Sequence, residues 1–235
     1  MPGSERVARV VKRTALTARV NELVLEVAGA PPFRWQAGQY LTLHPEGGVG
    51  AHEGPLAYSI ASHCDGTEPP RLALAVGPGT GAVVLADVGP GALLPVDGPF
   101  GSFTLPVAAG ALLVGAGTGV APLRAHVWEW LARADAGPIV LLAGARMEGD
   151  LLWQRELVEL ALRFPQFHFE PVLSQPAPGW SGRVGRVHEH LPALVATMPR
   201  GFLTRVCGAK AMVDASLAAL ASLGIASDRI ESESY

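Results

Sequence analysis

The chain has 235 residues, of which 49% are hydrophobic, so it can bury a core in one large or two modest domains. Its 18 basic residues are spread along the sequence and the net charge is −3, which argues against nucleic acid or an anionic membrane surface as a partner. The two cysteines, Cys64 and Cys207, lie far apart without a CxxC motif. This excludes a cysteine-ligated iron–sulfur cluster within the chain, argues against a disulfide framework and fits a reducing cytoplasm.

The N-terminal segment and one uncharged stretch bear on targeting. Residues 1–13 alternate charge with valine and contain no apolar core of signal-peptide length, so we expect no targeting segment. Residues 98–123 carry no charged residue, but glycines and prolines interrupt them. They therefore predict a turn, a short strand and a helix start rather than a membrane span.

The first half of the chain has the pattern of short strands separated by turns rich in glycine and proline. Short runs with a strand-like pattern lie at 6–12, 22–27, 39–43, 56–61, 71–76 and 92–96. Six such strands predict an antiparallel β-barrel. A Gly-Pro-Phe-Gly turn at 98–101 closes this half, so we place the boundary near residues 104–108, with a barrel domain at 1–105 and a second domain at 106–235.

The second half alternates short apolar strands with helical patterns. Strands are predicted at 111–114, 139–143, 167–173 and 203–207, and apolar residues recur at helical spacing within 123–131 and 152–161. Strands that alternate with helices usually pair in parallel. This half therefore predicts an α/β domain with a parallel sheet and helices on both faces.

The most informative segment is residues 112–122, where an apolar strand runs into a Gly-Ala-Gly-Thr-Gly turn that opens a helix. Backbone N–H groups at a helix N-terminus favour an anion, and glycines let the main chain approach it closely. The spacing differs from the GxGxxG of ordinary dinucleotide-binding dehydrogenases. On its own, the segment leaves a nucleotide pyrophosphate site and a simple tight turn as alternatives.

Five segments in one order resemble the ferredoxin-NADP reductase family. Residues 33–40 look like its F-x-x-G-Q-Y strand, and residues 57–62 (Ala-Tyr-Ser-Ile-Ala-Ser) look like its flavin motif, R-x-Y-S-x-x-S. Residues 115–122 match its pyridine-nucleotide motif, residues 206–212 resemble C-G-x-x-x-M, and residues 229–235 resemble its C-terminal strand. The resemblance covers essentially the whole chain. It implies a barrel that holds flavin and an α/β domain that holds NAD(P)H.

The resemblance also implies roles for individual residues. Tyr58 would lie against one face of the isoalloxazine ring, and Ser59 would hydrogen-bond near the flavin nitrogen that receives hydride. Tyr235 would cover the opposite face until the nicotinamide displaces it. Cys207 would lie beside the nicotinamide, with Glu233 near enough to orient it or to relay a proton.

By this resemblance the candidate catalytic residues are Ser59, Cys207, Glu233 and Tyr235. The candidate cofactor-binding residues are Ala57, Tyr58, Ser59, Gly79, Thr80, Gly81, Gly115, Gly117, Thr118, Gly119, Ala121, Pro122, Arg146, Arg183, Cys207, Gly208, Met212 and Tyr235. Taken singly, several have structural interpretations, because strand positions, a buried cysteine and a frayed terminus would look the same. Their order along the chain supports the functional interpretation.

The chain departs from the family pattern at the expected flavin phosphate. Leu56 stands where the family has an arginine, and Val84 stands in the loop 79–84 where Ser or Thr is usual. One hydrogen bond to a charged group contributes about 1.5–3 kcal/mol, or roughly 10- to 150-fold in affinity. Three alternatives follow: FAD or FMN binds loosely, a substitute such as Arg71 orients it, or no flavin is held.

The choice between NADH and NADPH rests on the loop 144–150 after the second α/β strand. This loop holds one arginine, Arg146, against two acids, Glu148 and Asp150, whereas a 2′-phosphate needs cations. The segment 172–185 resembles the corresponding loop of NADH-dependent oxygenase reductases. Both observations favour NADH, and Arg183 is expected either to contact the cofactor diphosphate or to be an exposed loop residue.

No metal site or hydrolase motif is predicted. His188 and His190 are two residues apart and would point to different sides of a helix, so we expect a solvated helix start there. The serines lack a GxSxG elbow.

The sequence therefore predicts a two-domain reductase that moves electrons between NAD(P)H and a separate protein through a flavin. The expected partner is a ferredoxin, an oxygenase component or another subunit of a complex. Two alternatives stay open: a flavin-poor subunit that only binds nicotinamide nucleotide, and a free-flavin reductase that uses flavin as a substrate.

Overall fold

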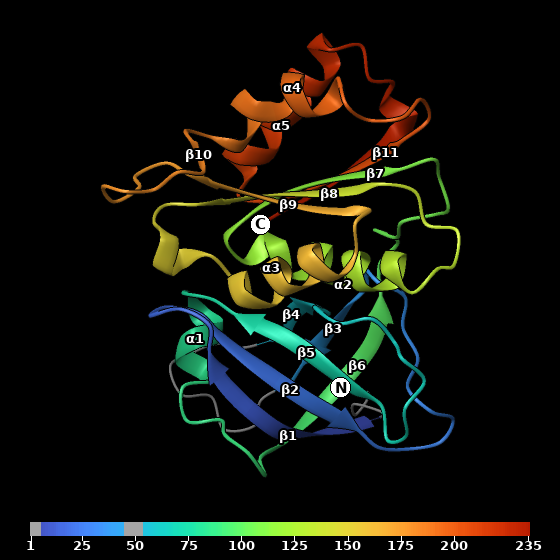
Figure 1. Cartoon of the computed structure of the whole chain (residues 1–235). Coiled ribbons are helices and arrows are strands. Elements are labelled where there is room, and N and C mark those ends of the chain that lie inside the picture. The colour runs from blue at the N-terminus through green and yellow to red at the C-terminus, as the bar shows by residue number, and fades with distance from the viewer. Residues whose placement is uncertain (1–5, 45–53) are drawn as a thin grey trace. The chain divides into compact units, whose positions relative to one another are not determined.

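The computed structural model describes residues 6–44 and 54–235, which form two compact units, Met1–Thr104 and Leu105–Tyr235 (Figure 1). Residues 1–5, which belong to the segment where we expect no targeting signal, lie outside the described residues.

The first unit is an antiparallel sheet of six strands in the order β4-β3-β6-β1-β2-β5. Its strands are β1 (Arg6–Ala15), β2 (Asn21–Val27), β3 (Tyr40–Leu43), β4 (Leu56–Ser59), β5 (Arg71–Val76) and β6 (Leu93–Phe100). The two edge strands meet, because Ile60 after β4 bridges Leu74 of β5 and the N–H of Ala61 donates to the carbonyl of Ala73 at 2.7 Å. The predicted antiparallel barrel is therefore confirmed.

One short helix differs from the sequence prediction in this unit. The segment predicted as a phosphate-binding loop contains the helix α1 (Thr80–Val84). The Nη1 group of Arg13 on β1 donates to the carbonyls of Leu85, Ala86 and Val88, at 3.1, 2.6 and 2.7 Å. These carbonyls belong to the turn that follows α1, so the Arg13 side chain ties this turn to β1.

The second unit is a six-stranded parallel sheet in the order β10-β9-β8-β7-β11-β12, as the strand–helix alternation predicts. Its strands are β7 (Ala111–Ala116), β8 (Ile139–Ala145), β9 (Phe167–Leu173), β10 (Arg183–Val184), β11 (Leu203–Gly208) and β12 (Ile230–Ser234). Its α-helices are α2 (Val120–Leu131), α3 (Gln154–Arg163), α4 (Leu191–Val195) and α5 (Lys210–Ser222). Short 3₁₀ turns are η1 (Gly117–Gly119), η2 (Glu148–Asp150), η3 (Val187–His190) and η4 (Ser227–Arg229).

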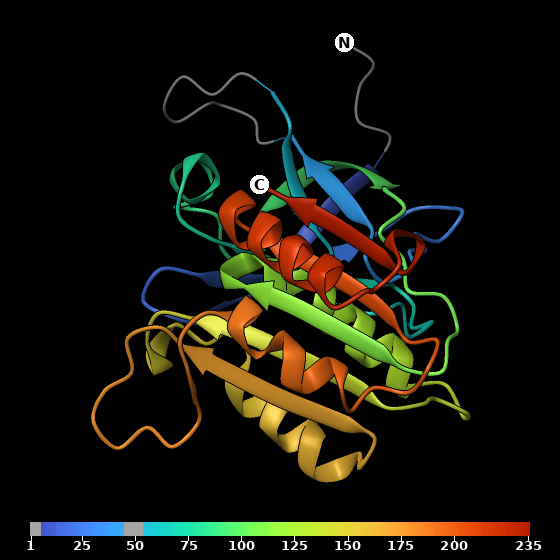
Figure 2. The same cartoon turned by 90° about the horizontal axis from the view of Figure 1, so that it is seen from above.

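Helices cover both faces of the parallel sheet. Helices α2 and α3 lie on one face and α4 and α5 on the other, as Figures 1 and 2 show. Residues Ala111–Val114 of β7 and Ile139, Leu141 and Leu142 of β8 are fully buried. Such continuous apolar strands are typical of a sheet that is covered on both sides.

The strand order reverses beside β7. After β7 the chain passes through α2 to β8 and β9 on one side, and it later returns to β11 on the other side. Ligands of open α/β sheets bind outside the carboxyl ends of the strands at such a switch point. We therefore expect a ligand site at the carboxyl end of β7, where the Gly-rich turn follows.

Candidate functional site

The Gly-rich turn joins β7 to α2 through η1 and lies against the end of β11. A Cβ on Gly119 would overlap the carbonyl oxygen of Cys207 and would lie 2.7 Å from the Cα of Gly208. A Cβ on Gly115 would lie 2.6 Å from a methyl of Leu123, and Gly117 has φ +55°, a conformation that glycine adopts without strain. Close packing of Gly115 against α2, close packing of Gly119 on β11 and the left-handed conformation of Gly117 therefore explain all three glycines.

Two residues predicted to bind a cofactor in this segment are part of the interior. Ala121 and Pro122 are buried in the first turn of α2. Proline is tolerated there because its missing N–H has no partner in a first turn. Their burial shows that they pack beneath the loop, and their predicted role in binding a cofactor stays a prediction.

The C-terminal tyrosine reaches this turn. The Tyr235 hydroxyl accepts a hydrogen bond from the N–H of Gly119 at 2.8 Å and donates to the carbonyl of Ala116 at 3.2 Å. The residue is 66% exposed overall, yet burial of its hydroxyl raises the pKa of Tyr235. The Tyr235 hydroxyl thus already accepts the hydrogen bond of one backbone N–H group at the start of α2, that of Gly119.

Cys207 and Glu233 are brought together by strand pairing. They are opposite each other in the parallel pair β11–β12. Burial, with a smaller effect of Glu233, raises the pKa of the Cys207 thiol to about 12. Burial and then the neighbouring Glu231 raise the pKa of Glu233. Both effects favour the protonated forms, so at neutral pH Cys207 is a thiol and not a nucleophilic thiolate.

We expect the two cysteines to react very differently with iodoacetamide in the native protein at pH 8. Cys207 is 2% exposed and protonated, whereas Cys64 is partly exposed. Mass spectrometry after brief alkylation should find the label on Cys64, and Cys64→Ser should remove nearly all labelling. Rapid modification of Cys207 in the folded variant would contradict this description of the thiol.

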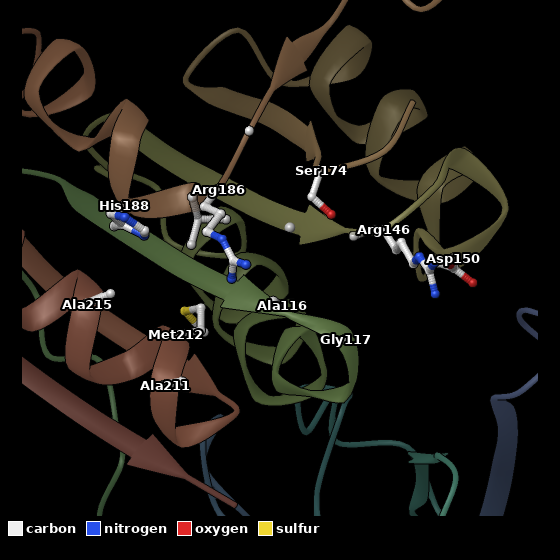
Figure 3. A pocket seen from close by; sticks show the side chains of 14 residues that line it. Ala116, Gly117, Arg146, Asp150, Ser174, Arg186, His188, Ala211, Met212 and Ala215 are labelled. Atoms are coloured by element: carbon white, nitrogen blue, oxygen red, sulfur yellow. The ribbon is translucent and has the colours of Figure 1, made fainter. Parts of the chain in front are cut away.

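A cavity of about 310 Å³, here called the nucleotide pocket after the ligand that we propose for it below, opens at the carboxyl ends of the strands of the second unit. Its walls come from the ends of β7, β8 and β9, from residues 185–188, and from the first two turns of α5 (Figure 3). Of the predicted residues, Gly117, Arg146 and Met212 line it. Two of the segments that line the cavity pack closely on each other, because a Cβ on Gly144 at the end of β8 would lie 2.7 Å from a methyl of Val187.

Arg183, one of the predicted cofactor-binding residues, does not line the nucleotide pocket. Its Nε donates to Oε2 of Glu170 at 2.8 Å, so its guanidinium is engaged in an ion pair beside β9. The expectation that Arg183 either contacts the cofactor diphosphate or is an exposed loop residue stays a prediction. Three residues that the sequence analysis did not select, Ser174, Arg186 and His188, line the pocket instead. Residues 182–186 read Gly-Arg-Val-Gly-Arg, so the sequence contains two Gly-Arg pairs. The second pair could have indicated Arg186 as a candidate.

The predicted flavin residues lie in the first unit around β4 and α1. The Tyr58 hydroxyl lies on Gly81 so closely that a Cβ there would overlap it. Burial raises the pKa of Tyr58 to about 12. Ala57 is exposed, Ser59 is half-buried, and Gly79 has φ +127° before the exposed Thr80. The Ser59 hydroxyl has no hydrogen-bond partner among residues 6–44 and 54–235, which leaves it able to bind a ring nitrogen.

The residues that correspond to the family's contacts with the flavin phosphate are apolar in this chain. Leu56 is 8% exposed and belongs to the core cluster of the barrel, against which Val84 and Tyr58 also pack. Arg71, the proposed substitute, binds Glu26 through Nε at 3.1 Å and Nη2 at 3.0 Å. The described residues thus fit the ring of a flavin, while Leu56 and Val84, the two residues compared with the family's phosphate contacts, are apolar side chains that are buried and partly buried, respectively.

Comparison with known proteins identifies the family. A family model described as an oxidoreductase NAD-binding domain matches residues 113–217. Ferredoxin–NADP reductase B of Sorangium cellulosum is 40% identical over 194 residues, which are 80% of this chain and 77% of that protein. The chain belongs to the ferredoxin-NADP reductase family. It is accordingly an NAD(P)H-dependent oxidoreductase.

Two further relatives extend the comparison of this family member. The reductase subunit of an aromatic O-demethylase from an Amycolatopsis species is 30% identical over 217 residues, covering 88% of this chain and 62% of that subunit. The crystal structure of an Amycolatopsis cytochrome P450 reductase matches with a TM-score of 0.84 at 29% identity, covering 97% of this chain and 69% of that one. The chain spans only 47% to 62% of several curated relatives. None of the helices in the described part of the chain is long and apolar enough to span a bilayer.

Proposed function

We propose that the chain passes electrons between NAD(P)H and a separate redox protein through a flavin held in the barrel. The observation that carries this proposal is the second unit's site. There the Gly-rich turn, Cys207, Glu233 and the Tyr235 hydroxyl meet at the switch point of the parallel sheet. The family model of an NAD-binding domain matches residues 113–217, which include the Gly-rich turn and Cys207, and this supports the assignment of the site to nicotinamide nucleotide.

The chain's own residues have separable tasks in this reaction. A bound flavin supplies the conversion of a two-electron hydride transfer into single-electron transfers. Backbone N–H groups of the turn 117–119 bind the nucleotide's diphosphate at the start of α2. Cys207 offers the nicotinamide a small, polarizable and protonated contact. Glu233, whose pKa burial raises, lies beside it as the candidate proton relay, and Ser59 offers a hydroxyl to the flavin ring.

The electron acceptor is proposed to be a separate protein, either a ferredoxin or an oxygenase component. The name of the Sorangium relative includes a ferredoxin, and the Amycolatopsis relative is the reductase subunit of an O-demethylase. The chain's two cysteines, both free, cannot by themselves hold a four-cysteine cluster. Free cysteines also support the proposed cytoplasmic location.

The preference for NADH stays a proposal. It rests on Glu148 and Asp150 outnumbering Arg146 in the loop after β8. Of these two acids only Asp150 lines the nucleotide pocket, and Arg186 adds a second cation to it. Dissociation constants for NADH and NADPH, measured side by side, decide the preference.

A second candidate function is reduction of a flavin that binds and leaves as a substrate. The buried Leu56 and the engagement of Arg71 by Glu26 favour it, because both weaken the hold on a flavin phosphate. Loose binding suits a flavin that must dissociate.

Reduction of ferricyanide by NADH and NADPH tests both candidates. The dialysed protein is assayed without added flavin and then with FAD or FMN in excess. Turnover without added flavin supports the resident-flavin reductase, and turnover that rises in proportion to added flavin supports the second candidate. Absence of turnover in every mixture would contradict both.

Tyr235→Phe is expected to tighten nucleotide binding roughly 2- to 10-fold, the range of one net hydrogen bond. The substitution frees the Gly119 N–H that the hydroxyl occupies, while the ring remains. Dissociation constants from calorimetry check the result. Tyr40→Phe, which removes a tyrosine hydroxyl from β3 of the other unit, serves as the matched control. Equal or weaker binding by Tyr235→Phe would show that the nucleotide does not use this N–H.

A further inference from the structure

Strand β12 carries a second carboxylate on the same face as Glu233. This strand lies at the edge of the parallel sheet among the described residues, and it ends at the mark C in Figure 2. Ile230 packs against the core cluster that includes residues of α5. Because successive side chains of a strand point to opposite faces, Glu231 and Glu233 share the face that turns away from α5. Two residues of a strand span about 6–7 Å, so the two carboxyl groups are close neighbours.

An arginine of the neighbouring strand pairs with Glu231. In the parallel pair β11–β12, Arg205 is opposite Glu231, and Cys207 is opposite Glu233. Nη2 of Arg205 lies 3.2 Å from Oε2 of Glu231, and its Nη1 donates to the carbonyl of Thr204 at 3.0 Å. The Arg205 side chain is 6% exposed, whereas that of Glu231 is 39% exposed. The buried arginine therefore holds the ionised carboxylate of Glu231 at one place beside Glu233.

The other ionisable groups near Glu233 contribute less charge to its surroundings. On the elements packed against β12, besides Arg205, they are Cys207 of β11, Lys210 and Asp214 of α5, and Asp228 and Arg229 of η4. The α5 residues form an ion pair with each other at 2.8 Å and belong to the opposite face of the sheet, and the η4 residues are exposed before the start of β12. Cys207 and, at the end of the chain, Tyr235 keep their protons at neutral pH, because burial raises the pKa of both groups. Glu231 is thus the charged neighbour that acts on Glu233, and it raises the pKa of Glu233 after burial has done so.

We propose that the ion pair Arg205–Glu231 controls the charge beside Glu233 and thereby sets the pH at which Glu233 gives up its proton. This proposal rests on the proposed function, in which Glu233 is the proton relay. Glu231 opposes ionisation of Glu233 through its negative charge, and Arg205 limits this effect by pairing with it. Both are positioning residues, because they act through Glu233. Removal of one partner at a time should therefore shift the titration of Glu233 in opposite directions, which a merely structural role of the pair does not explain.

NMR of the full chain with isotopically labelled glutamate carboxyl carbons measures this titration without any cofactor. The signal of Glu233 is the one that is lost in Glu233→Gln. Glu231→Gln should lower the titration midpoint of Glu233 by about 0.5–1 pH unit, because a like charge is removed. Arg205→Met should raise the midpoint by about the same amount, because Glu231 then acts without its partner. The double variant should titrate near the wild type, because the pair is removed as a neutral unit.

An unchanged or raised midpoint in Glu231→Gln would overturn the proposal, and this result decides alone if Arg205→Met does not fold. Two controls accompany it. Arg205→Lys keeps the positive charge and should keep the midpoint of the wild type. Glu159→Gln removes an exposed glutamate of α3 that pairs with Arg155, and it should likewise leave the midpoint unchanged.

The pH profile of ferricyanide reduction after reconstitution with FAD tests the proposed function separately. A profile that moves together with the midpoint of Glu233 in Glu231→Gln supports both the ion-pair proposal and the role of Glu233 as a relay. A midpoint that moves while the profile stays in place supports the ion-pair proposal and overturns that role.

Discussion

Replacing Gly119 with alanine is expected to abolish nucleotide binding and to destabilise the second unit. The added Cβ would overlap the carbonyl oxygen of Cys207 and crowd the Cα of Gly208 at 2.7 Å. Both are backbone atoms of a central strand, so the turn must move away from β11. Overpacking of this kind costs about 1–3 kcal/mol, and the displaced turn no longer presents its N–H groups.

Calorimetry and thermal unfolding measure the two consequences of Gly119→Ala separately. Gly149→Ala is the matched control in the same unit, because a Cβ at Gly149 meets nothing within 4 Å and its φ is not positive. The control should keep the affinity and melting temperature of the wild type. A Gly119→Ala protein with wild-type affinity and stability would refute the close packing of this turn on β11.

Leu56→Arg is expected to increase flavin retention roughly 10- to 150-fold, the value of one hydrogen bond to a charged group. Leu56 stands two residues before Tyr58 on β4, so the two side chains share a face of the strand. The long arginine stem can cover apolar surface while its head reaches a phosphate. Retention is measured as the flavin dissociation constant from fluorescence titration with FAD and FMN.

The control for this prediction must separate flavin binding from barrel stability, because Leu56 belongs to the barrel core. Leu56→Met keeps an apolar side chain of similar volume and should leave both properties near the wild type. Thermal unfolding shows whether Leu56→Arg folds. Unchanged flavin affinity in a folded Leu56→Arg barrel would mean that no flavin phosphate lies near this position.

The strand patterns predicted the architecture because a strand that is buried on one face differs in its sequence pattern from a strand that is buried on both faces. Short strand-like runs between turns rich in glycine and proline marked the barrel strands, and the unbroken apolar runs of β7 and β8 marked a sheet covered on both faces. The helix α1 escaped prediction. Its five residues carry no helical period, and a cation from β1, Arg13, binds carbonyls of the turn that follows it. Such a long-range contact leaves no local sequence signal.

The candidate site shows the same division between local and long-range information. The turn 115–119 was recognisable because its glycines follow from local geometry and close packing. Arg183 and Arg186 look alike in sequence, and only the pairing of Arg183 with Val172 places it beside Glu170 and away from the pocket. Arg71 likewise looked available until Glu26 on the neighbouring strand was seen to bind it. Arg71 and Arg183 form ion pairs with glutamates of neighbouring strands, and the sequence alone does not reveal these pairs.

The visible absorption spectrum of the purified protein, recorded without oxygen after reconstitution with FAD and before and after addition of NADH or NADPH, tests the central claim most directly. The account predicts a protein-bound flavin spectrum that one or both nucleotides bleach, since hydride transfer reduces the ring. A protein that binds nicotinamide nucleotide but takes up neither FAD nor FMN would contradict the account and identify a nucleotide-binding subunit.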